Sequence, residues 1–176
     1  VLRAHKQGRQ NFVERAKEVG LVHIGFGLET ASPKILKTID KSGQTVEKME
    51  VAVAEVQRVL GYVDCSFIVG SPGETTETVS ETVEFCKRTN LRPEVFFYTT
   101  AYPATKFWEL AVANGLITKS VTGVADVVTD DIIEQYFLLL GEQGSHVRTN
   151  FSDLEDDEVL QLARWAVDEL NPTETK

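Results

Sequence analysis

The stretch from Val63 to Thr75 constrains the fold more than any other part of the sequence. Residues 62–69 are rich in β-branched and aromatic side chains, and their carboxyl half is a continuous apolar run, which is typical of a parallel strand covered on both faces. Gly70-Ser71-Pro72-Gly73 has the composition of a tight turn, and Thr75 or Thr76 can cap a following helix. This order predicts an α/β protein, in which ligands bind beyond the carboxyl ends of the strands.

Composition narrows the class of protein and its partners. The chain has 176 residues, 42% of them hydrophobic, which suits one domain with a real core. A net charge of −9 argues against a nucleic-acid partner, which needs a basic face. The sequence has no apolar run of membrane-spanning length, no signal peptide and only two cysteines, Cys65 and Cys86. We therefore expect a cytoplasmic protein with no membrane partner and no disulfide framework.

The same strand–loop–helix pattern occurs three times. We expect strands over residues 21–28, 62–69 and 94–100, and helices over residues 11–19, 32–39, 45–60 and 76–89, with a short helix between Thr105 and Asn114. In the first helix, Phe12, Ala16 and Val19 share the face expected to point inward. Alternating strands and helices predict a parallel sheet or a segment of a barrel.

After Gly115 the pattern changes to helices and polar segments. Residues 120–129 are small and polar and are expected to form a loop, followed by a helix over residues 130–140 and a polar stretch over residues 141–150. Ser152-Asp153-Leu154-Glu155 has the sequence of a capping box before a last helix. The buried side of that helix is predicted to carry Val159, Ala163, Ala166 and Leu170.

Each predicted strand ends in a polar, turn-forming loop, and in a parallel sheet the three loops open at the same end. Glu29 could accept hydrogen bonds from ligand hydroxyls, but alone it is more often a carboxylate near a helix N-terminus. Glu74 is either a first-turn carboxylate or a ligand contact. The glycines of Gly25-Phe26-Gly27 lack a third partner for a dinucleotide fingerprint, and no Lys-Ser/Thr pair follows Gly73 for a phosphate loop. The sequence shows no metal-spaced cluster and no catalytic triad.

Four motifs in register resemble the second half of the radical SAM core. They are Gly27-Leu28-Glu29-Thr30, Leu36-Lys37-Thr38-Ile39-Asp40-Lys41-Ser42, Phe67-Ile68-Val69-Gly70-Ser71-Pro72-Gly73-Glu74-Thr75 and Tyr102-Pro103-Ala104-Thr105-Lys106-Phe107-Trp108. The resemblance is strongest to the group associated with cobalamin-binding domains and to methylthiotransferases. It implies the last three strands of a partial (β/α)6, TIM-like barrel with parallel strands, over residues 1–117, with residues 118–176 as an accessory C-terminal helical segment.

The resemblance also implies positions for ligand contacts. Glu29 and Ser32 fall where the family contacts the ribose of S-adenosylmethionine, and Ile68, Gly70 and Glu74 fall on the motif that supports the adenosine. Tyr98 and Thr100 lie on the strand whose backbone meets the adenine, and Lys41 matches a recurrent position of unassigned role.

Two departures from the family pattern affect the expected chemistry. The C-x3-C-x2-C motif that holds the family's 4Fe-4S cluster is absent, so the cluster ligands are expected upstream of Val1, in a missing first half of the barrel. Ala104 replaces the usual glycine of Pro-Gly-Thr.

We expect part of a radical SAM enzyme that cleaves S-adenosylmethionine to a 5′-deoxyadenosyl radical and modifies a small-molecule substrate. Methyl transfer and the use of cobalamin are left open. The alternative is a non-catalytic α/β module that keeps a nucleoside site and has lost the cluster.

Overall fold

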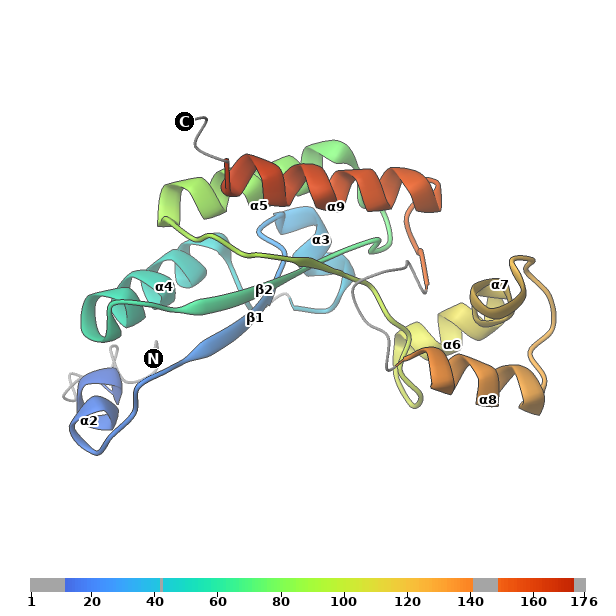
Figure 1. Ribbon diagram of the computed structural model, residues 1–176, viewed down its shortest axis with the longest axis horizontal. Helices are drawn as coiled ribbons and strands as arrows, with labels where there is room; N and C mark the ends of the chain where they lie inside the picture. Colours follow the sequence, from blue (N-terminus) through green and yellow to red (C-terminus); the bar gives the residue numbers. More distant parts are fainter. Residues whose placement is uncertain (1–11, 42, 141–148, 173–176) are drawn as a thin grey trace.

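The computed structural model describes residues 12–41, 43–140 and 149–172 (Figure 1). Three parallel strands, β1 (Gly25–Glu29), β2 (Asp64–Val69) and β3 (Phe96–Tyr98), form one sheet in the order β1-β2-β3. The helices are α2 (Phe12–Glu18), α3 (Pro33–Thr38), α4 (Val46–Leu60), α5 (Thr76–Thr89), α6 (Lys106–Ala113), α7 (Leu116–Thr122), α8 (Asp130–Leu139) and α9 (Asp156–Leu170). The predicted α/β class with parallel strands is confirmed. In the parts of the chain described here, no helix is long and apolar enough to cross a membrane.

The alternation of side chains along β2 separates a buried face of the sheet from an open one. Cys65, Phe67 and Val69 are buried, whereas Asp64, Ser66 and Ile68 are exposed or half-buried. On the buried face Phe67 stacks on Phe96 of the neighbouring strand, with ring centroids 5.4 Å apart. The helices therefore cover one face, and the other face remains accessible to a ligand.

Local signals fix the two longest helices before residue 100 where the sequence predicts them. Thr45 caps α4 by accepting the Lys48 N–H, and Gly61 ends it in the left-handed region with φ of 82°. Thr75 and Thr78 cap α5 reciprocally, since each side chain accepts the other residue's backbone N–H. Helix α4 therefore ends shortly before β2, and α5 begins shortly after it, as the sequence predicts.

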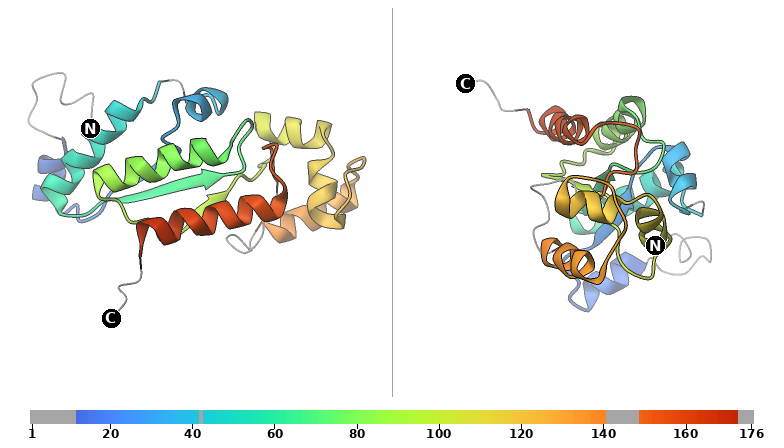
Figure 2. Two further views of the ribbon diagram at one scale, coloured as in Figure 1. Left: turned by 90° about the horizontal axis from the view of Figure 1, so that it is seen from above. Right: turned by 90° about the vertical axis from the view of Figure 1, so that its right-hand side faces the viewer.

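The chain leaves the sheet after β3, builds a separate helical unit and then returns. Helices α6, α7 and α8 form this helical unit around a second core of Ala101, Ala111, Ile117 and Tyr136. The unit lies beyond the carboxyl ends of the strands, at the right of Figure 1. Helix α9 then packs beside α5 over the sheet (Figure 2). The predicted inward residues of α9 are confirmed, because Val159, Ala163, Ala166 and Leu170 all belong to the main core.

Several predicted details are wrong. Helix α2 buries Val13 against α4, while Phe12 and Val19 are 55% and 87% exposed, so the predicted inward face is rotated. The strands are shorter than predicted because β-forming residues become a strand only where a neighbour pairs with them. Residues 120–122 belong to α7, where packing against α6 and α8 overrides a weak helix propensity.

The capping box predicted at Ser152–Glu155 is also wrong. Ser152 hydrogen-bonds the Asn150 side chain instead, with Oγ 2.6 Å from Oδ1. The helix begins one turn later, and the Glu155 N–H donates to the Glu158 carboxylate at 2.8 Å. Asn11, the first residue of the first predicted helix, and the predicted polar stretch over residues 141–148 lie outside the described part of the chain.

Candidate ligand site at the carboxyl ends of the strands

Glu29 ends β1 in an unusual backbone conformation. Its φ is 66°, in the left-handed region that costs a non-glycine residue about 1–2 kcal/mol, and the register with β2 shifts between Gly27 and Glu29. The side chain folds back over Gly27, where an added Cβ would lie 2.7 Å from the Glu29 Oε1 atom. A hydrogen in place of a side chain at residue 27 therefore makes room for this carboxylate.

Lys41 holds the Glu29 carboxylate in that position. Its Nζ lies 2.9 Å from Glu29 Oε1 and donates to the Gly27 carbonyl at 3.0 Å. The Glu29 side chain keeps 25% of its surface exposed. The ion pair therefore fixes one carboxylate oxygen in a side chain that is still partly exposed.

The loop after β2 is organised by Glu74. The Ser71 N–H donates to Glu74 Oε2 at 3.0 Å, and the side chain is only 2% exposed. Burial raises the pKa of Glu74 to about 7, against the backbone N–H groups of Ser71 and Gly70, which favour the carboxylate. Glu74 precedes α5, and its carboxylate accepts a hydrogen bond from within its own loop, so it stabilises the conformation of that loop.

Between these two loops the open face of the sheet is small and apolar. Gly27 lies beside Ser66 in the register of β1 and β2, and Ile68 lies beside Phe97 in the register of β2 and β3. Ile68 and Phe97 are half-buried. The open face between the two loops therefore carries a glycine, the Ser66 side chain and two half-buried apolar side chains.

Of the three remaining predicted contact residues, Thr100 lies at the strand ends, Tyr98 points its side chain towards α9, and Ser32 is buried. Thr100 is the second residue after β3, at the same end of the sheet, and its hydroxyl donates to the Tyr98 carbonyl at 3.1 Å. The Tyr98 side chain packs towards α9, where it lines a groove with Arg164, so its backbone alone faces the strand ends. Ser32 is fully buried at the start of α3, and its Oγ has no hydrogen-bond partner among the described residues.

Glu29, Ile68, Gly70 and Thr100 thus lie at one end of the sheet, whereas Glu74 and Ser32 are buried. Sequence reasoning missed the role of Lys41, although it noted the position. Only the fold brings that amine to the Glu29 carboxylate.

The described residues offer no place for an iron–sulfur cluster. They contain no group of three or more Cys, His, Asp or Glu side chains arranged for a metal. Cys65 and Cys86 are both buried, and burial raises the pKa of each thiol to about 12, which disfavours the thiolate that binds iron.

The fold defines an α/β protein with a candidate ligand site at the carboxyl ends of its parallel strands. Within that class, residues 6–86 match the sequence model of the radical SAM superfamily. The match confirms the superfamily over this segment, which holds three of the four motifs; Tyr102–Trp108 lies outside it.

Two curated relatives agree with this assignment. An uncharacterized methyltransferase of Pyrococcus horikoshii is 40% identical over 101 residues, which cover 57% of this chain and 22% of the relative. A tRNA-2-methylthio-N(6)-dimethylallyladenosine synthase of Buchnera aphidicola subsp. Cinara cedri is 30% identical over 100 residues, which cover 54% of this chain and 23% of the relative. The matched region spans less than a quarter of either curated relative.

Proposed function

We propose that this chain supplies the S-adenosylmethionine-binding part of a radical SAM enzyme. The observation that carries the proposal is the Glu29 carboxylate, held over Gly27 by Lys41 in a left-handed conformation within the segment that matches the superfamily. Backbone strain that the surrounding structure maintains is typical of ligand sites. A partly exposed carboxylate near half-buried apolar side chains suits the ribose hydroxyls and adenine of a nucleoside.

The residues at the strand ends fit S-adenosylmethionine. Glu29 would accept hydrogen bonds from the ribose, Ile68 and Gly70 would contact the adenine, and the backbone of Tyr98 and Thr100 would meet its edge. Glu74 and Ser32 are buried, so we assign them to shaping the loops that carry these contacts. S-adenosylmethionine bound there would supply a methyl group or, with an electron from a 4Fe-4S cluster, a 5′-deoxyadenosyl radical.

We further propose that the sheet is the second half of a (β/α)6 partial barrel. Strand β1 pairs only with β2 among the described residues, so its other edge is open to a further parallel strand. The cluster ligands would come with the strands that complete the barrel, since the described residues hold no metal-binding group. The boundary expected between residues 117 and 118 stays a prediction, and the packing of α9 on the sheet favours counting α9 with the barrel and α6–α8 as an insert.

The substrate is proposed to be a small molecule. The net charge of −9 disfavours a polyanionic partner such as tRNA, which the name of the Buchnera relative specifies for that protein. The name of the Pyrococcus relative supports methyl transfer as the outcome. Cobalamin would serve as the methyl carrier if the complete protein includes a domain for it. The cytoplasmic location stays a prediction.

The test is made on the full-length protein with its cluster reconstituted. Incubation with S-adenosylmethionine and a reductant should release 5′-deoxyadenosine or S-adenosylhomocysteine. Glu29→Gln should raise the dissociation constant for S-adenosylmethionine about tenfold, since a charge-assisted hydrogen bond becomes a neutral one. Glu81→Gln, an exposed site on α5, is the matched control.

The outcomes separate the proposal from its alternative. Full-length protein that binds S-adenosylmethionine, holds no iron and releases neither product would support a non-catalytic nucleoside-binding module. Protein that binds no S-adenosylmethionine would refute both readings of the site.

A further inference from the structure

The Gly70 loop is tied to a segment of the chain about eighty residues away in sequence, well outside the part that matches the superfamily. The Phe151 N–H donates to the Gly70 carbonyl at 2.9 Å. Two residues earlier, the Thr149 hydroxyl donates to the Thr99 carbonyl at 2.9 Å and accepts the Ala101 N–H at 3.1 Å. Residues 149–151 therefore connect both loops at the carboxyl ends of β2 and β3, and we name them the strap.

The strap replaces hydrogen bonds that the sheet would otherwise make. The Thr99 N–H donates to the Val69 carbonyl at 2.8 Å, so in a continued parallel ladder the Thr99 carbonyl would accept from the Ser71 N–H. Ser71 instead donates to Glu74, and Thr149 supplies the missing donor to Thr99. The hydrogen-bond ladder between the two strands therefore stops here, and the Thr149 hydroxyl stabilises the position of the Thr99 carbonyl.

Hydroxyl groups fill the space between the separated strands. Ser71 Oγ lies 3.2 Å from Thr99 Oγ1, which donates to the Val69 carbonyl at 3.0 Å. Ser71, Thr99 and Thr149 are each no more than 2% exposed. A buried polar group that loses its partner is costly, so removal of the Thr149 hydroxyl must either leave two backbone groups unpaired or shift the loops.

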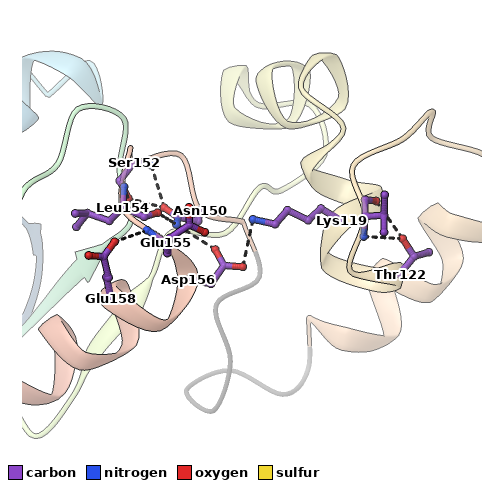
Figure 3. A network of polar contacts seen from close by, with 9 residues as sticks. Lys119, Thr122, Asn150, Ser152, Leu154, Glu155, Asp156 and Glu158 are labelled. Carbon is purple, nitrogen blue, oxygen red and sulfur yellow. Dashed lines mark hydrogen bonds and ion pairs between the residues drawn. The ribbon is translucent and has the colours of Figure 1, made fainter.

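The strap is held from both sides. Asn150 accepts the Ser152 N–H at 3.0 Å, and its Nδ2 donates to the Leu154 carbonyl and to Asp156 at the start of α9 (Figure 3). Lys119 of α7 reaches the same Asp156 carboxylate, with 3.4 Å between Nζ and Oδ2 (Figure 3).

A stacked pair of rings adds a second contact between the strap and the helical unit. The Phe107 ring of α6 lies over the Phe151 ring, with centroids 5.0 Å apart. The position of the strap is therefore set by α9 on the sheet and by the helical unit.

We propose that Thr149 is a positioning residue for the S-adenosylmethionine site. Its hydroxyl fixes the backbone after Thr99 while the adjoining strap fixes the Gly70 carbonyl, so the two loops meet the adenine at a set separation. This inference rests on the proposed function. It makes ligand affinity depend on a residue that the helical insert returns to the sheet, outside residues 6–86.

The experiment measures binding of S-adenosylmethionine to the full-length protein by calorimetry, without reductant. Thr149→Val removes the hydroxyl at nearly constant shape and should raise the dissociation constant about tenfold. Thr149→Ser restores the hydroxyl and should bind within about twofold of wild type. The control is Thr118→Val, because Thr118 is also buried and donates to the Val127 carbonyl at 3.2 Å within the helical unit.

Amide hydrogen exchange at residues 70–74 gives a readout independent of the ligand. Thr149→Val should accelerate exchange of the Ser71 amide, and Thr118→Val should not. If Thr149→Val binds as tightly as wild type while its melting temperature falls like that of Thr118→Val, Thr149 is merely structural and the inference is overturned. Wild-type protein that binds no S-adenosylmethionine would overturn the proposed function together with this inference.

Discussion

Replacing Glu74 by glutamine is expected to change the pH dependence of stability between pH 5 and 8.5. The folded protein raises the pKa of this carboxyl from its ordinary value of 4.5 to about 7, because burial disfavours the charged form. A raised pKa in the folded state means that the contribution to stability is complete below pH 4.5 and is lost as the pH rises through 7.

The size of the loss follows from the difference between the two pKa values, which corresponds to about 3 kcal/mol in the free energy of unfolding. Glutamine has almost the same shape, and its carbonyl can still accept the Ser71 N–H. It carries no charge at any of these pH values, so the variant should not lose this contribution. Part of this loss has already occurred at pH 5, which lies above the unfolded value of 4.5. Relative to wild type, Glu74→Gln should therefore gain about 2.5 kcal/mol between pH 5 and pH 8.5.

Urea unfolding at the two pH values, followed by circular dichroism, measures this double difference and cancels any constant cost of the amide. Glu81→Gln is the control, because Glu81 is an exposed carboxyl on α5. Parallel pH profiles for wild type and Glu74→Gln would show that the buried carboxyl does not titrate in this range, and the account of the Gly70 loop would be wrong.

Three further substitutions test other features. Gly27→Ala places a Cβ 2.7 Å from Glu29 Oε1 and should weaken S-adenosylmethionine binding, measured by calorimetry, about tenfold. The control is Gly43→Ala, whose added Cβ meets nothing within 4 Å and should leave binding unchanged. Equal binding by both variants would exclude a role for the Glu29 conformation. Ala104→Gly should raise the free energy of unfolding by about 0.5 kcal/mol, because a φ of 62° strains the backbone of alanine more than that of glycine. Ala54→Gly within α4 should lower the free energy of unfolding by about 1 kcal/mol. A lower free energy of unfolding in both variants would show that Ala104 is not strained. Phe67→Ala should cost about 3–5 kcal/mol in urea unfolding, since the ring is fully buried, and a cost below 1 kcal/mol would place the core elsewhere.

The sequence predicts those parts of the fold that depend on neighbours along the chain. The caps Thr45 and Thr75 and the stop at Gly61 are local, and the structure has all three. The inward face of α2 is not local, because α4 decides that Val13 rather than Phe12 is buried. Periodicity alone cannot identify a packing partner.

The candidate site follows the same division. The three polar loops at the strand ends could be expected from strand–turn–helix order, and they do lie at one end of the sheet. The Lys41–Glu29 ion pair and the contact of Thr149 with Thr99 join residues 12 and 50 positions apart. Such pairs leave no spacing in the sequence, so the fold has to be seen before they are known.

The helical unit departs from the sheet and returns to it at nearly the same point, since the Ala101 N–H and the Thr149 hydroxyl are one hydrogen bond apart. An excursion whose two ends already touch can be exchanged for another of different length without moving the strands or α9. Evolution could therefore vary the helical unit beyond the strand ends and keep the sheet, which would let one fold accept many substrates. Grafting the corresponding insert of a relative between these two residues would be a direct route to altered selectivity.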